Sequence, residues 1–277
     1  MIKITVATVT YNAESVLRRT VDSVKSQDYP LVEHLIIDGA SKDGTLKIAR
    51  DYAREVADEG GEHEVRIVSE PDAGLYDAMN KALRLATGHY IVFINAGDRL
   101  HDASTLSLIV ASTGADGERV QDASLPAVVY GDTDIVDDGG RFMHRRAHRP
   151  PEHLTWRSFR QGMLVCHQAF YALTDIARAV PYDMRYRHSA DVDWCIRVMK
   201  EADRRGRTIV NARAVVADYL SEGHTTANHG ASLRERFGVM RRHYGLAVTV
   251  VMHAWFAARA VWRLIKSRLS FGHRSGR

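Results

Sequence analysis

Short apolar runs alternate with amphipathic stretches through residues 1–100. The runs are rich in β-branched residues and lie at positions 2–9, 33–37, 65–68 and 90–94. Between them, apolar side chains recur every three or four residues, which is the period of a helix with one buried face. Strands that alternate with helices over short connections predict a doubly wound α/β layer, in which helices cover a parallel sheet.

The stretch 70–98 combines a helical stripe, a glycine stop and a buried strand. The stripe consists of Leu75, Met79, Leu83 and Ala86. Gly88 follows it, at the place where a left-handed helix cap is expected. The strand that comes next ends abruptly in the polar segment 95–98. Because open α/β sheets bind ligands at the carboxyl ends of their strands, this segment is the first candidate binding site.

Beyond residue 100 the alternation loosens. Strand-like runs at 127–130 and 209–217 flank a helical stretch that begins near Asp191 and Asp193. The Arg- and His-rich run 141–149 has two interpretations. It is either a solvated surface loop or a contact to phosphate or to an acidic acceptor.

The segment 224–277 has a different pattern, that of a basic amphipathic helix. One helical face carries Val250, Val251, Ala254, Trp255, Ala258, Val261, Trp262, Ile265 and Leu269. Off that face lie His253, Arg259, Arg263, Lys266 and Ser270. A helix of this composition is typical of a membrane surface, and docking on the protein's own core is the alternative. We therefore expect one domain at 1–223, with halves at 1–100 and 101–223, followed by this tail.

Composition narrows the class of protein. The 277 residues are 45% apolar and 26% charged, with a net charge of +4, as in ordinary soluble domains. This charge is too small to indicate nucleic-acid binding by itself, but it is uneven, since Glu235 is the one acid after Arg234. Cys166 and Cys195 are too few for a disulfide scaffold, which favours a reduced, cytosolic setting. No signal-peptide pattern opens the chain, and no stretch is an uninterrupted membrane span.

Four elements together resemble the glycosyltransferase family 2 enzymes. They are the segments 10–12, 38–45, 70–98 and 190–194. The likeness runs over about 2–223, and it is closest to bacterial transferases that build cell-surface polysaccharides or glycolipids. The resemblance implies a GT-A fold, with a Rossmann-like, mostly parallel sheet flanked by helices, and here with a C-terminal helical extension.

A nucleotide-sugar site must hold a base, a ribose, a diphosphate and a sugar. Tyr11 is expected to cover the base, Glu14 to reach the ribose and Asp38 to accept the imide N–H of uracil. An ordinary turn or cap role is the alternative for Asp38. Asn80 is expected to hydrogen-bond the donor. The remaining expected contacts are Thr10, Asn12, Asp72, Asn95, Ala96 and Gly97.

The resemblance places Asp98 at the metal-binding end of the family's Asp-x-Asp signature. Mg²⁺ or Mn²⁺ at this position would neutralise the leaving diphosphate. Asn95 and Gly97 stand where many relatives carry Asp, so most of the coordination is expected from the diphosphate and water. His224 is either a further ligand or an ordinary surface histidine. Met79 replaces an Arg of many relatives, which removes one phosphate contact.

Asp191 matches the family's general base, which takes a proton from the acceptor hydroxyl in an inverting transfer. A helix start keeps such a carboxylate ionised. Asp193 competes for the role, although its spacing favours a structural function. His167 and Gln168 are expected to line the acceptor or sugar pocket, and the two cysteines to pack in the core.

The function predicted from the sequence is an inverting, metal-assisted transfer from a nucleoside-diphosphate sugar, with UDP as the default and dTDP or GDP open. The expected acceptor is lipid-linked or a cell-surface glycan, at the inner face of the cell membrane. A sugar nucleotidyltransferase is disfavoured because 8–15 lacks its Gly-rich loop. A non-catalytic nucleotide-sugar binder or membrane-assembly partner of the same fold stays open. Nucleic acid is not an expected partner.

Overall fold

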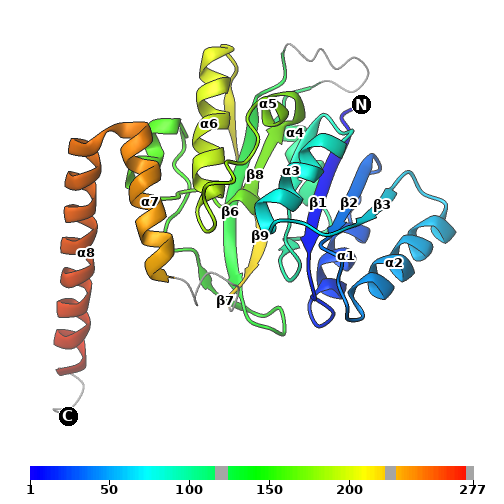
Figure 1. Cartoon of the computed structure of the whole chain (residues 1–277), viewed down its shortest axis with the longest axis horizontal. Helices are drawn as coiled ribbons and strands as arrows, with labels where there is room; N and C mark the ends of the chain where they lie inside the picture. Colours follow the sequence, from blue (N-terminus) through cyan, green and yellow to red (C-terminus); the bar gives the residue numbers. More distant parts are fainter. Residues whose placement is uncertain (116–123, 222–228, 273–277) are drawn as a thin grey trace.

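The computed structural model describes residues 1–115, 124–221 and 229–272. These residues form one curled sheet of nine strands with helices packed against it, as Figure 1 shows. The N-terminal strands are parallel and stand in the order β3-β2-β1-β4. They are β1 (Ile4–Thr10), β2 (Val32–Asp38), β3 (Glu64–Ser69) and β4 (Tyr90–Phe93). The helices between them are α1 (Leu17–Lys25), α2 (Thr45–Glu59) and α3 (Leu75–Leu85). The predicted α/β alternation is confirmed.

The second half of the chain extends the sheet with mixed strand directions. Its strands are β5 (Arg99–Leu100), β6 (Val128–Val136), β7 (Phe142–Arg145), β8 (Phe170–Leu173) and β9 (Ile209–Leu220). β8 lies antiparallel between β4 and β6, whereas β6 and β9 are parallel. The sheet is therefore less parallel beyond β4 than the sequence led us to expect. The helical segments here are α4 (Thr105–Ser112), η2 (Trp156–Gln161), η3 (His167–Ala169), α5 (Thr174–Ala179) and α6 (Ala190–Arg204).

Trp194 on α6 joins the two halves of the chain in one hydrophobic core. Its side chain is fully buried. Its ring stacks on Tyr182 at a centroid distance of 4.8 Å and meets the edges of Phe93 at 5.8 Å and Phe170 at 5.7 Å. Large aromatic side chains contribute more buried area than any other type. This contact therefore fixes α6, and with it Asp191, against the end of β4.

The tail consists of two helices, α7 (His229–Tyr244) and α8 (Leu246–Gly272). Gly245 separates them with a φ of 83°, a conformation that favours glycine and allows the chain to reverse. In Figure 1, α7 lies beside α6 and α8 runs back along α7 on the outside of the molecule. Within the described ranges, no helix is both long enough and apolar enough to cross a membrane.

Gly88 has a different role from the left-handed cap that the sequence indicated. α3 ends at Leu85 and is capped by Ala86 with a φ of −54°, and Gly88 does not adopt a positive φ. A Cβ on Gly88 would lie 2.6 Å from the Thr5 backbone N and 2.8 Å from the Lys3 carbonyl O. A glycine is required here because the β1 backbone passes directly over it.

We therefore expect Gly88→Ala to destabilise the fold by roughly 1–3 kcal/mol, because strand β1 would have to shift. The matched control is Gly61→Ala, where the nearest atom to an added Cβ is 4.0 Å away. Chemical denaturation of both variants tests this. Equal stability of the two would contradict the proposed close approach.

His34 on β2 is buried between two hydroxyl groups. Its Nε2 lies 2.9 Å from Thr8 Oγ1, and its Nδ1 lies 2.8 Å from the Tyr52 hydroxyl. Burial lowers the pKa of His34 to about 3. The unfolded chain therefore binds a proton near pH 6.5 that the folded chain binds only near pH 3.

His34 therefore contributes stability that is complete above pH 6.5 and is lost as the pH drops, by about 1.4 kcal/mol per pH unit between roughly pH 6 and pH 4. His34→Gln should remove this slope, whereas Gln at the exposed His144 should leave it intact. Urea denaturation across this pH range measures both slopes. An unchanged slope in the His34 variant would show that this residue is not the titrating group.

Candidate functional site

The loops that follow β1 and β2 are joined to each other by hydrogen bonds. Thr10 and Asp38 are register partners at the two strand ends. Asn12 accepts the Lys42 N–H at 2.9 Å, and its own N–H donates to Ser41 Oγ at 2.9 Å. Asn12 has a φ of 47° and Ala40 a φ of 62°. Left-handed conformations at non-glycine residues cost energy and cluster at functional sites.

Asp38 is fully buried and shapes this turn. Its Oδ2 accepts the Ser41 N–H at 3.0 Å and the Ser69 hydroxyl at 2.7 Å, and its Oδ1 accepts the Ser41 hydroxyl. These bonds are those of a turn aspartate, the alternative considered from the sequence. The recognition of an imide N–H by Asp38 stays a prediction.

Tyr11 is the most accessible aromatic residue of the candidate base site, with 62% of its surface exposed. A Cβ on Gly39 would lie 3.3 Å from the Tyr11 ring and 2.6 Å from Asp72 Oδ2. The exposed Tyr11 ring, the Gly39 backbone, which has no side chain, and a carboxylate oxygen of Asp72 thus lie close together. These groups match the needs of a base and a ribose.

Glu14 and Asn80 lie differently from their predicted roles. Glu14 accepts the Gly44 N–H at 2.9 Å, so it ties two protein loops together and leaves Asp72 nearer to Tyr11 as the ribose candidate. Asn80 is buried, and its amide group pairs with the backbone N–H and C=O of Tyr182 at 2.7 and 3.0 Å. Asn80 therefore holds the loop before α6, and its contact with the donor stays a prediction.

Asp98 is buried at the end of β4. Its Oδ2 accepts the Gln168 amide N–H at 2.7 Å, and its Oδ1 accepts the Leu220 N–H at 3.0 Å. Burial raises the pKa of Asp98 to about 6, although both hydrogen bonds oppose the rise. A nearby cation would favour the ionised form of this carboxylate.

The residues around Asp98 suit a cation that receives most of its ligands from elsewhere. Asn95 Oδ1 is buried without a hydrogen-bond partner in the described part of the chain, and so is Thr10 Oγ1. Leaving such atoms unpaired is costly, and oxygen atoms are the ligands that Mg²⁺ and Mn²⁺ prefer. No group of three or more His, Cys, Asp or Glu residues among the described positions forms a complete metal site. The predicted ligand His224 lies outside the described residues. Ala96 and Gly97 occupy the same strand end, where the Gly97 N–H donates to Thr20 Oγ1 at 2.9 Å.

Asp191 lies in the first turn of α6 and faces the strand end. Its Oδ2 is 3.5 Å from His167 Nδ1, and its Oδ1 accepts the Tyr76 hydroxyl at 3.2 Å. Burial acts to raise the pKa of Asp191, but the hydrogen bond from His167, together with nearby positive charge such as Arg236 on α7, outweighs it. The net effect holds this pKa below its usual range, so the carboxylate is ionised at neutral pH.

The neighbouring residues His167 and Gln168 connect the two carboxylates of the site. The Asn95 amide N–H donates to His167 Nε2 at 3.2 Å, which leaves Nδ1–H directed to Asp191. The next residue, Gln168, binds Asp98. Five residues that the sequence nominated separately therefore form one connected cluster: Asn95, Asp98, His167, Gln168 and Asp191.

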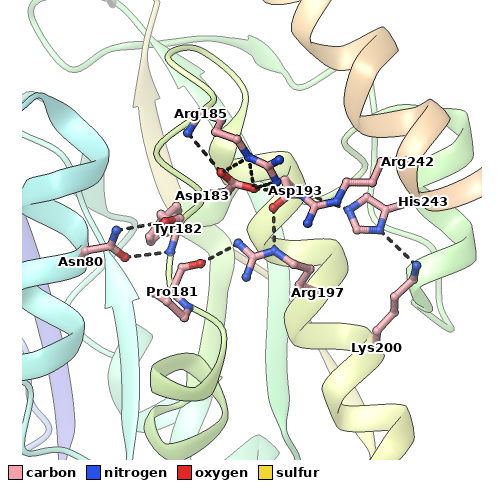
Figure 2. Close-up of polar contacts among 10 residues, drawn as sticks. All are labelled: Asn80, Pro181, Tyr182, Asp183, Arg185, Asp193, Arg197, Lys200, Arg242 and His243. Atoms are coloured by element: carbon pink, nitrogen blue, oxygen red, sulfur yellow. Dashed lines mark hydrogen bonds and ion pairs between the residues drawn. The ribbon is translucent and has the colours of Figure 1, made fainter.

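Asp193 points away from this cluster. It is fully buried and accepts hydrogen bonds from Arg197 Nε at 2.6 Å and His243 Nε2 at 2.8 Å, as Figure 2 shows. Beside it, Asp183 accepts a hydrogen bond from Arg242 at 2.8 Å. Asp193 therefore fastens α6 to α7 and does not line an acceptor pocket. Two residues on, a helix has turned by more than half a circle, which explains the separation from Asp191.

Two residues that support the site, Tyr76 and Glu235, were not predicted from the sequence. Tyr76 sits in the same 70–98 stretch, but nothing in the pattern distinguishes it from a core tyrosine. Glu235 on α7 accepts the N–H groups of Arg187 and His188 at 2.9 and 2.7 Å, which fixes the segment before Asp191. Its isolation as the one acid in a basic tail was a signal that could have been used.

Comparison with known proteins identifies the family. Residues 5–175 match the sequence model of glycosyl transferase family 2. The chain belongs to this family.

Relatives of this family 2 chain include a PGL/p-HBAD biosynthesis glycosyltransferase of Mycobacterium tuberculosis, which is 34% identical over 189 residues. The match covers 68% of this chain and 66% of that protein, just under two thirds of its length. An uncharacterized glycosyltransferase of the same species is 25% identical over 92% of this chain and 90% of its own.

Solved structures share the GT-A architecture. TarS of S. aureus, solved in complex with UDP-GlcNAc, has a TM-score of 0.64 at 18% identity, over 86% of this chain and 64% of its own. The mannosyltransferase PcManGT of Pyrobaculum calidifontis, in complex with GDP-Man and Mn²⁺, has a TM-score of 0.62 at 18% identity, over 98% of this chain and 81% of its own. At this level of identity the likeness concerns the fold alone.

The contribution of the contact between Asp193 and His243 to the stability of the fold can be measured. His243→Ala should lower the free energy of unfolding by roughly 1–3 kcal/mol, because a buried carboxylate loses one of its hydrogen-bond donors. Arg204→Ala is the control, since it breaks an ion pair with Glu201 in which the Arg204 side chain is 70% exposed, and it should cost under about 1 kcal/mol. Denaturant unfolding at neutral pH compares them. Equal losses would mean that the buried contact does not stabilise the attachment of α7.

Proposed function

We propose that this chain is an inverting glycosyltransferase that moves a sugar from a nucleoside diphosphate to an acceptor hydroxyl. The observation that carries the proposal is the cluster in which the strand-end groups Asn95 and Asp98 connect through His167 and Gln168 to the ionised Asp191. Asn95 and Asp98 form the part that would bind a metal ion and the diphosphate, and Asp191 is the part that would accept a proton. Family membership supports the same reaction class.

The nucleotide would occupy the edge formed by the β1 and β2 loops. Tyr11 covers the base, and Asp72 lies where a ribose hydroxyl would follow it. Thr10 Oγ1 and Asn95 Oδ1 gain the partners that they lack in the protein alone. UDP is the default nucleotide, and GDP and dTDP are the alternatives for the experiment below.

Asp98, with Asn95 beside it, would hold Mg²⁺ or Mn²⁺ together with the diphosphate and water. When bound, this ion supplies positive charge that stabilises the leaving diphosphate. The protein's own contribution is to keep one carboxylate buried, oriented by Gln168 and the Leu220 N–H.

Asp191 would take the proton of the acceptor hydroxyl while the hydroxyl oxygen attacks the anomeric carbon. The new C–O bond forms on the face opposite the breaking bond to the diphosphate, so the configuration inverts. His167 and Tyr76 hold the carboxylate in one orientation. The acceptor we propose is a lipid-linked or cell-surface glycan, since the relative with 34% identity is named for PGL/p-HBAD biosynthesis.

A thermal-shift panel tests the donor site. UDP, GDP and dTDP are added with and without Mn²⁺, and a bound nucleotide raises the melting temperature by mass action. We expect stabilisation by UDP that increases with Mn²⁺. If all three leave the melting temperature unchanged, the donor-site assignment is wrong.

Replacing Asp191 by Asn separates an enzyme from a non-catalytic nucleotide-sugar binder. Turnover should fall by about 10²–10⁴-fold, because general-base catalysis is lost. The thermal shift with UDP should persist, because the donor contacts remain. Asp203→Asn, at an exposed carboxylate on the same helix, is the control and should keep full activity. Unchanged turnover in the Asp191 variant would remove it from the mechanism.

A further inference from the structure

α8 packs on the protein with a face that carries Thr249, Met252, His253 and Phe256, which are buried or half-buried. Thr249 is fully buried, and the His253 ring meets Phe237 of α7 at a centroid distance of 5.0 Å. Phe256, one turn further, contacts His253 at 5.7 Å. A helix that docks on its own protein to bury apolar surface normally turns its most apolar stripe inward. α8 does not do so.

The members of the predicted apolar stripe whose exposure the structure describes face outward. Val250 is 50% exposed, Val251 66%, Trp255 43% and Trp262 61%. Val251, Trp255 and Trp262 follow one another at helical spacing, so they form one continuous ridge. Arg259 lies over the Trp255 ring at 4.6 Å and places a positive charge beside the ridge. Contiguous exposed apolar surface of this kind marks an interaction site.

The charge of the helix identifies the chemistry of its partner. From residue 246 to residue 277 the sequence contains six Arg and Lys and no acid. The six are Arg259, Arg263, Lys266, Arg268, Arg274 and Arg277. A second copy of the same helix would bring like charges together, whereas an anionic lipid surface offers opposite charge and an apolar interior. Trp is a residue that prefers the boundary between lipid and water.

A second exposed apolar element is β7, which pairs with β6. Phe142 and Met143 on β7 are 60% and 51% exposed, within the Arg- and His-rich run 141–149. The turn before β7 is next to α1, where the Asp137 carbonyl accepts a hydrogen bond from Arg19 at 3.3 Å. Figure 1 shows α8 descending to the lower end of the molecule, where β7 lies and toward which β1 runs.

We infer that the Val251–Trp255–Trp262 ridge of α8, assisted by Phe142 and Met143, binds the surface of an anionic lipid bilayer. This contact turns the end of the sheet that carries Asp98 toward the lipid, where a lipid-linked acceptor would be found. The inference goes beyond the proposed sugar transfer, because binding to lipid requires neither a donor nor Asp191. It also gives a physical basis for a location at the membrane surface.

Co-sedimentation of the full chain with vesicles tests the inference. Vesicles of phosphatidylcholine that contain about 30 mol% of the anionic lipid phosphatidylglycerol are compared with vesicles of pure phosphatidylcholine. We expect at least about tenfold tighter binding to the anionic vesicles, weakened by added salt. Trp255→Ser with Trp262→Ser should reduce that binding by about tenfold or more. Leu233→Ser, at an apolar residue of α7 that is 47% exposed, is the matched control and should bind as the unmodified chain.

The outcomes separate the alternatives. Equal binding to both vesicle types, or binding that survives the Trp replacements, overturns the inference. An absence of vesicle binding also overturns the inference. If the chain then self-associates and the Trp variant does not, the ridge is an interface between copies of the chain. Loss of binding in the Phe142→Ser, Met143→Ser variant supports the orientation, and unchanged binding overturns that part alone. The melting temperature without ligand checks that each variant is folded, and Asp191→Asn should bind vesicles normally even if the proposed function fails.

Discussion

The bridge that His167 makes between Asn95 and Asp191 is the interaction on which the candidate site depends. Asn95 belongs to the end of a sheet strand, and Asp191 belongs to the start of a helix almost one hundred positions later. A neutral imidazole can accept from one side and donate to the other, so its tautomer is fixed by the two neighbours. The same residue lowers the pKa of Asp191. One side chain thus sets both the position and the ionisation of the proposed base.

Buried contacts in the core hold α6, which carries Asp191, in place. Trp194 and Tyr182 stack beneath α6, and the Asn80 amide group pins the Tyr182 backbone. From the other side, α7 contributes Glu235 to the loop before α6 and His243 to the buried Asp193. The C-terminal helices are therefore attached to the segment that carries Asp191. Catalytic groups need such support, because small displacements of a base from its substrate cost activity.

The sequence predicted the framework better than the details, and the reasons are physical. Periodicity identified the parallel strands and their helices, because β1, β2 and β4 are buried along their whole length and the helices between them each bury one apolar face. It did not identify β8 or the short strands β5 and β7, whose pairing depends on distant partners. Family resemblance nominated Asp98, His167 and Asp191, and the structure places them together. It could not show that Asn80 and Glu14 already have protein partners, because hydrogen-bond partners are decided by tertiary contacts. Gly88 illustrates the same limit, since the requirement for glycine comes from a strand eighty residues away.

The most direct test of this account is a crystal structure of the chain with UDP and Mn²⁺. The account predicts the uracil ring against Tyr11, the diphosphate and ion at Asp98 and Asn95, and new partners for the unpaired oxygens Thr10 Oγ1 and Asn95 Oδ1. It also predicts open space between the bound diphosphate and Asp191 for a sugar and an acceptor hydroxyl. A nucleotide bound elsewhere, or one bound at this edge with Asp191 directed away from it, would contradict the account.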